Sequence, residues 1–181
     1  MTIDVNPTSM KPTGTDWRSE VWATLQRENV ELFAYLPDGG LDFLIRRLHA
    51  EIPDRAVMLT TEEEGVGICC GAWLGGRRAM LAIQSSGVGN CINAFSLVTN
   101  CRFPFFLLVS MRGEFGEGNP WQVPMGRMTG EALRLAGFHV FSAIKEDEAA
   151  AIVAGGLSMA FRSEEPVAVL LSQRLLGAKN L

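Results

Sequence analysis

Hydrophobic and polar positions divide the chain into two kinds of segment that follow one another in turn. Short runs that are apolar almost throughout predict buried strands, and longer segments with apolar residues at helical spacing predict helices. The expected strands cover residues 31–35, 56–60, 79–83, 104–109, 138–143 and 166–171. The expected helices cover residues 17–29, 41–49, 63–74, 90–99, 126–135 and 146–161.

This alternation predicts the fold class. Strands that are apolar along their whole length, rather than at every second position, belong to sheets covered on both faces. We therefore expect an α/β fold: a doubly wound, mainly parallel six-stranded sheet with helices on both faces. A length of 181 residues suits one domain. We expect residues 17–181 to form it, preceded by a flexible polar arm at residues 1–16.

Composition narrows the choice of partners and of compartment. The chain is 48% hydrophobic with a net charge of −4, so it offers no basic surface for nucleic acid or for anionic lipid. No apolar run reaches the roughly 18 residues that span a bilayer, and the first residues lack the apolar block of a signal peptide. These features predict a cytoplasmic protein that binds small molecules or other proteins.

The chain has few cysteines and histidines, and their spacing matches no metal-binding or catalytic motif. The four cysteines, Cys69, Cys70, Cys91 and Cys101, show no CxxC spacing, and we expect them to be buried reduced thiols. The two histidines, His49 and His139, lie in apolar contexts. A catalytic triad with histidine or a metal site on this chain is therefore not expected.

Glycine-rich segments follow three of the expected strands, at the sheet edge where open α/β folds bind ligands. They are residues 36–40 (LPDGG), 84–90 (QSSGVGN) and 111–120 (MRGEFGEGNP). The second lacks the third glycine of a dinucleotide fingerprint, and the chain has no GxxxxGK[ST] motif. We expect Ser85–Asn90 to be a turn, and the residues leave open whether it is structural or faces a ligand.

Glu62 is the most informative carboxylate. It follows the strand at 56–60, which delivers it to the same edge, and it opens the small-residue helix EEEGVGICCGAWLGG. Three adjacent glutamates in a first helical turn also suit helix capping and the helix dipole. The pattern alone leaves both roles open.

Taken in order, these segments resemble a known family. EEEGVGICCGAWLGG, AMLAIQ, SSGVGN, FPFFLLVSMRG and NPWQVPMG together resemble the pyrimidine-binding (PYR) domain of thiamine-diphosphate enzymes. Within that superfamily the chain is most similar to the separate α subunits of sulfopyruvate decarboxylase and to related phosphonopyruvate decarboxylases. The resemblance runs from about residue 17 to residue 171.

The resemblance implies roles for particular residues. Glu62, nine positions before Gly71, matches the glutamate that hydrogen-bonds a ring nitrogen of the aminopyrimidine and so activates the cofactor; the positions of Glu63 and Glu64 carry no chemistry in the family. Ser86, Gly87, Gly89 and Asn90 match the segment beside the cofactor. Pro37 matches the loop after the first strand, which also approaches the cofactor.

At each of three further positions, two interpretations stay open. Asp38 falls one position short of the acid that some relatives carry, so it is either catalytic or a solvated turn residue. Arg112 either pairs with an acid group of the substrate or forms an ordinary salt bridge. Gln122 stands where decarboxylase relatives commonly carry histidine. An amide can bind an intermediate but cannot shuttle a proton, so carboligation stays open.

An absent motif implies a partner. The family binds the diphosphate through Mg²⁺ on a second domain with a GDG motif and paired asparagines, and this chain has no GDG. The resemblance thus implies a β subunit that carries this domain, and a hetero-oligomer that shares thiamine diphosphate and Mg²⁺ between its chains. The chain would be the α subunit of a 2-oxo acid decarboxylase, a carboxy-lyase active only with that partner.

Other functions remain as alternatives. They are a subunit of an acetolactate synthase-like carboligase and a non-catalytic α/β binding or regulatory module. A self-contained flavodoxin-like or hydrolase enzyme is disfavoured, because the chain lacks both a nucleotide fingerprint and a GxSxG elbow.

Overall fold

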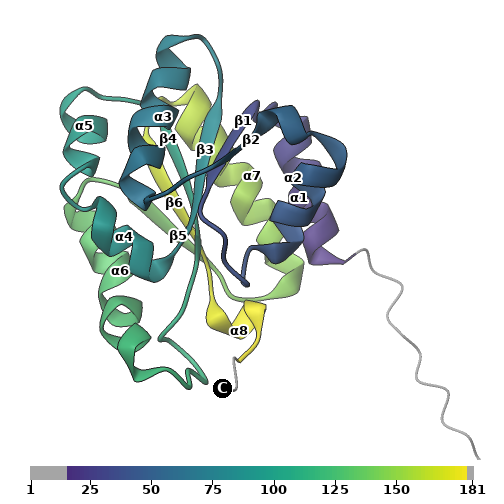
Figure 1. Cartoon of the computed structure of the whole chain (residues 1–181), viewed down its shortest axis with the longest axis vertical. Helices are drawn as coiled ribbons and strands as arrows, with labels where there is room; N and C mark the ends of the chain where they lie inside the picture. The colour runs from purple at the N-terminus through teal and green to yellow at the C-terminus, as the bar shows by residue number, and fades with distance from the viewer. Residues whose placement is uncertain (1–15, 179–181) are drawn as a thin grey trace, which may run out of the picture.

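Six parallel strands form the centre of the computed structural model, which describes residues 16–178 (Figure 1). They are β1 (Leu32–Tyr35), β2 (Ala56–Met58), β3 (Ala79–Gln84), β4 (Phe105–Ser110), β5 (His139–Ala143) and β6 (Pro166–Leu171). Every neighbouring pair is parallel. The predicted fold class is confirmed. The arm predicted at residues 1–16 lies outside the described residues except for Asp16.

Helices cover both faces of the sheet (Figure 1). On one face lie α1 (Trp17–Arg27), α2 (Asp42–Glu51) and α7 (Glu146–Arg162), and on the other lie α3 (Glu62–Leu74), α4 (Ser85–Cys91), α5 (Phe95–Asn100) and α6 (Val123–Leu135). The shorter elements are α8 (Gln173–Leu176) and 3₁₀ turns at Pro53–Arg55 and Pro120–Gln122. Successive residues of β4 enter opposite cores, with Phe106 in one and Leu107 in the other. This arrangement explains why the inner strands are apolar throughout.

The strand order creates a crevice at one edge of the sheet. The order is β2-β1-β3-β4-β6-β5, so the chain passes from β1 outward to β2 and then returns to β3 on the other side of β1. Connections after β1 and β3 therefore leave in opposite directions, and such a switch point opens a ligand-binding crevice at the carboxyl ends of the strands. The segments that begin at Leu36 and Ser85 border this crevice.

Several element boundaries differ from the sequence-based expectation. Residues 85–90 were expected to form a turn, but they are the main part of helix α4. The helix expected at residues 90–99 is divided into α4 and α5, and α6 begins at Val123 rather than at residue 126. Glycine usually marks a turn. Here Gly87 is helical, and its missing side chain makes room for a neighbouring carboxylate.

Most of the cysteines are buried within the fold. Cys69, Cys70 and Cys91 are buried as expected, whereas Cys101 is exposed, so that expectation was wrong for one of the four. Burial raises the pKa of Cys70 to about 11 and that of Cys91 to about 12, which keeps both thiols protonated.

Across residues 16–178, the helices are all too short or too polar to cross a membrane.

Candidate active site

The three adjacent glutamates at the start of α3 have separate environments. Glu64 reaches back to Thr60 and accepts hydrogen bonds from its backbone N–H (3.0 Å) and its hydroxyl (2.6 Å), which lowers the pKa of Glu64. Thr61, the N-cap residue, makes no side-chain cap. Glu63 is exposed. Glu64, rather than Glu62, therefore folds back onto the residue that precedes the N-cap of α3.

Glu62 turns toward α4 instead. Its Oε2 accepts a hydrogen bond from Asn90 Nδ2 at 2.9 Å, across 28 residues of sequence. A Cβ atom at Gly87 would lie 2.6 Å from Glu62 Oε1, so only glycine leaves room for the carboxylate. The structure thus brings Glu62, Gly87 and Asn90 together. Gly89 lies against Met125 of α6, where a Cβ would approach the thioether sulfur to 3.1 Å.

A small cavity of about 180 Å³ opens beside Glu62 at the switch point. Pro37 and Asp38 line it from the loop after β1, and Ser86 lines it from the start of α4. Gln84, the last residue of β3, accepts a hydrogen bond from Ser86 Oγ at 2.7 Å. Two carboxylates therefore line one open pocket to which three separate segments contribute.

Asp38 is held at the edge of the sheet by strand-end side chains. Its carboxylate accepts hydrogen bonds from Gln84 Nε2 (2.7 Å), from Ser110 Oγ (2.7 Å) and from the backbone N–H of Gly40 (2.8 Å). These donors come from β3, β4 and the loop itself, so Asp38 is not a freely solvated turn residue. Gln84 and Ser110 were not predicted as site residues, although a polar residue that ends an apolar strand was a readable signal.

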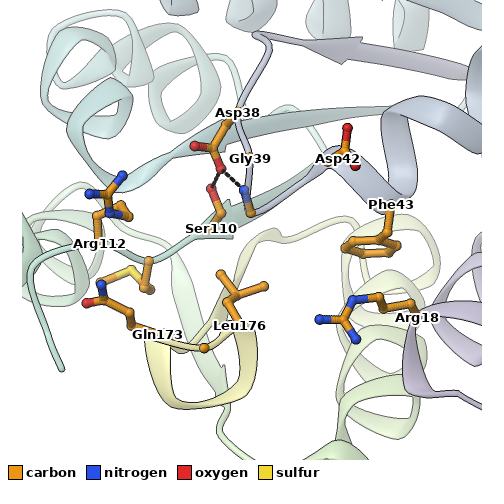
Figure 2. Close-up of a pocket in the computed structure, with 12 residues that line it drawn as sticks. Arg18, Asp38, Gly39, Asp42, Phe43, Ser110, Arg112, Gln173 and Leu176 are labelled. Carbon is orange, nitrogen blue, oxygen red and sulfur yellow. Dashed lines mark hydrogen bonds between the residues drawn. The ribbon is translucent and has the colours of Figure 1, made fainter. Parts of the chain in front are cut away.

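A second cavity of about 380 Å³ lies on the other side of Asp38. Figure 2 shows Asp38 and Ser110 on one wall, with Arg112 and Arg18 extending from opposite sides. Phe43 and Leu176 supply apolar surface between them. Asp38 lines both cavities and thus separates the small one from the large one.

Arg112 is strongly bound within the chain. Its Nε and Nη2 donate to the two carboxylate oxygens of Glu117 at 2.6 and 2.5 Å, and the two side chains are only 12% and 3% exposed. Glu117 also accepts hydrogen bonds from Gln173 Nε2 and from the backbone N–H groups of Gly113 and Asn119. The guanidinium, with help from the other donors, lowers the pKa of Glu117 to about 2. Arg112 keeps its place on the cavity wall, but as half of an ion pair.

Gln122 lines neither cavity. Its backbone carbonyl packs against Gly113, and its buried Oε1 accepts no hydrogen bond from the residues described. The isolated chain therefore does not bring Gln122 to the other candidate residues, and the catalytic role suggested for it remains an untested prediction.

Similarity to individual known proteins shows the family of the chain, although no protein-family model matches it. It is 34% identical over 152 residues to a protein named sulfopyruvate decarboxylase subunit alpha from Methanococcus maripaludis, covering 83% of this chain and 91% of that protein. It is 30% identical to the protein of the same name from Methanocaldococcus jannaschii, covering 83% and 89%.

More distant similarities support the fold. A phosphonopyruvate decarboxylase from Streptomyces viridochromogenes is 34% identical over 119 residues, 65% of this chain and 30% of that protein. A solved 2-oxoglutarate:ferredoxin oxidoreductase from Magnetococcus marinus superposes with a TM-score of 0.74 at 16% identity, over 90% of this chain and 29% of that one. The chain belongs to the family of sulfopyruvate decarboxylase α subunits.

Proposed function

We propose that this chain is the α subunit of a thiamine-diphosphate-dependent decarboxylase that acts on a small 2-oxo acid. The observation that carries the proposal is the position of Glu62. Glu64 turns back to Thr60, whereas the Glu62 carboxylate lies beside a cavity at the switch point of the sheet. The family to which the chain belongs supports the same reaction class.

The small cavity fits the aminopyrimidine half of the cofactor. Its volume of about 180 Å³ suits one six-membered ring, since a protein cavity of roughly 150 Å³ holds benzene. The carboxylates of Glu62 and Asp38 can accept hydrogen bonds from the amino group of the ring. A carboxylate can also share a proton with a ring nitrogen. When bound, thiamine diphosphate supplies an electron sink for the pair of electrons released as carbon dioxide leaves.

The residues of this chain then have distinct tasks. Glu62 shares a proton with a ring nitrogen, and the amide of Asn90 keeps its carboxylate turned toward the ring. Asp38 stands between the two cavities and exchanges a proton with the substrate, while Gln84 and Ser110 fix its position. The larger cavity receives the substrate, with Arg112 on its wall.

A partner chain is required for the other half of the cofactor. The two carboxylates beside the ring cavity repel a diphosphate, so we assign the diphosphate and Mg²⁺ to a β subunit that carries the GDG motif. The free cysteines suit the reducing cytoplasm, where we place the hetero-oligomer. Carboligation gains no support, since Gln122, the residue that suggested it, lines neither cavity.

Gly71 offers a test of where the partner docks. A Cβ added at Gly71 meets no atom within 4 Å and Gly71 is exposed, so a leucine there can extend into solvent, and we expect Gly71→Leu not to lower the melting temperature of the chain alone. If the β subunit packs on this side of α3, the leucine overpacks the interface and weakens association about tenfold or more. Analytical ultracentrifugation of the mixed chains measures this affinity.

Gly155→Leu is the matched control. Gly155 also has nothing within 4 Å of an added Cβ, but it lies on α7, on the opposite face of the sheet. We expect this variant to assemble normally. Wild-type affinity of the Gly71→Leu variant would place the partner elsewhere.

Calorimetric titration of thiamine diphosphate with Mg²⁺ tests the proposed division of the site. The cofactor should bind tightly to the mixture of this chain with a chain that carries GDG and the paired asparagines, and at least about a hundredfold more weakly to either chain alone. Equally tight binding to this chain alone would contradict the shared site, and no binding to the mixture would contradict the proposed function.

A further inference from the structure

We propose that Arg18, at the start of α1, is the cation that holds the second acid group of a substrate that carries two. This inference rests on the proposed function, because it takes the larger cavity as the substrate site. The substrate class is a 2-oxo acid with a sulfonate, phosphonate or second carboxylate at the end remote from the keto carbon. Arg18 lies far in sequence from every motif that suggested a function, so sequence reasoning missed it.

The two arginines of the cavity differ in how much of their charge is available. Arg112 is 12% exposed and forms two hydrogen bonds with the carboxylate of Glu117, so the pair has no net charge. The Arg18 side chain is 39% exposed, and its ion pair with Asp16, at 3.6 Å, is an exposed one in which Asp16 is itself 53% exposed, so it neutralises the charge only weakly. Of the two, Arg18 has the charge available for an anionic ligand.

Arg18 is nevertheless held in position. Its guanidinium lies over the ring of Trp17, 4.5 Å from the centroid, and Trp17 packs edge-on against Phe43 at 5.2 Å. Figure 2 shows the guanidinium extending toward the cavity from the side opposite to Arg112, beside Phe43. A cation stacked on an aromatic ring is partly ordered before the ligand arrives, which reduces the entropy cost of binding.

The other charged groups on the cavity wall give the substrate a direction. Asp42 is paired with Arg46 at 2.6 Å, and the Asp38 carboxylate is held by three donors at the edge next to the ring cavity. Arg18 attracts the second acid group to its side of the cavity, which leaves the keto carbon at the edge next to the ring cavity, where the cofactor ring is placed. The apolar surface of Phe43 and Leu176 separates the two ends.

Steady-state kinetics on the complex with its β subunit test this role, with sulfopyruvate as the dianionic substrate and pyruvate as the monoanionic one. Arg18→Gln should raise KM for sulfopyruvate about 10- to 100-fold, with kcat changed less than about threefold, and should leave KM for pyruvate unchanged. Arg18→Lys should recover part of the loss, since it keeps the charge but not the planar donors. Arg27→Gln, which removes a charge from the exposed end of the same helix, is the control.

Binding of 3-sulfopropanoate, which has both acid groups but no keto carbon, separates this inference from the proposed function. Calorimetry should give a dissociation constant about tenfold or more higher for Arg18→Gln than for wild type, with no change for propanoate. An inactive wild-type complex that keeps this difference would overturn the proposed function alone. Equal effects on sulfopyruvate and pyruvate, or unchanged 3-sulfopropanoate binding, would overturn the role of Arg18.

Discussion

Replacing Glu62 by Gln is expected to lower kcat of the assembled enzyme about a thousandfold, within the range that a general acid–base group contributes. Glutamine has nearly the same shape, and its amide oxygen can accept the hydrogen bond that Asn90 donates to Glu62. It cannot share a proton with a ring nitrogen. Decarboxylation should therefore be lost while the fold and the assembly remain, as measured by stopped-flow release of carbon dioxide and by size-exclusion chromatography.

Glu63→Gln is the matched control for this variant. Both substitutions remove one negative charge from the first turn of α3, so each loses the same small interaction with the helix dipole, about 0.3–1 kcal/mol. Glu63 is exposed and lies outside the ring cavity. Comparable losses of turnover in the two variants would reduce the role of Glu62 to helix stabilisation.

The second large effect is expected at Glu117, and it concerns stability. Glu117→Gln leaves the guanidinium of Arg112, only 12% exposed, without its charged partner. Breaking such a buried pair costs about 3 kcal/mol or more. For a chain of this size the melting temperature should fall by about 6–12 °C, measured by circular dichroism. Glu131→Gln, which breaks the exposed pair with Arg134, should change it by less than about 2 °C.

The same pair predicts a dependence on pH. Arg112 is the main cause that lowers the pKa of Glu117 to about 2 in the folded chain, from 4.5. A lowered pKa stabilises the folded state above the unfolded value, so the difference between wild type and Glu117→Gln should be fully present above about pH 5. It should shrink as the pH falls from about 4.5 toward 2. A difference that is constant across this range would mean that the charge of Glu117 does not stabilise the fold.

The sequence predicted the fold well because the fold depends on patterns that are local. Continuous apolar runs placed all six strands, and the burial of β3, β4 and β6 on both faces confirms the reason for that pattern, whereas the outer strands β2 and β5 are only partly buried. The segment at 85–90 was misread because glycine has two uses. At Gly87 it makes room for Glu62 within a helix, and that contact joins segments far apart in the sequence.

Only part of the candidate site was predictable, because several of its features depend on contacts between segments that lie far apart in the sequence. Register within the helix and order of motifs selected Glu62, but its different environment from Glu64 depends on the hydrogen bonds of Glu64 to Thr60 and of Glu62 to Asn90. The bidentate pairing of Arg112 with Glu117 depends on how the loop after β4 folds against α8. Arg18 enters the cavity only because α1 packs beside the loop after β1, a long-range contact without a sequence signature.

Carbon dioxide release from sulfopyruvate and phosphonopyruvate is the measurement that tests the central claim most directly. The assay compares this chain alone, its GDG-containing partner alone, and the two together, each with and without thiamine diphosphate and Mg²⁺. We predict turnover only when both chains and the cofactor are present. Turnover by this chain alone, or an assembled complex that releases no carbon dioxide with the cofactor bound, would contradict it.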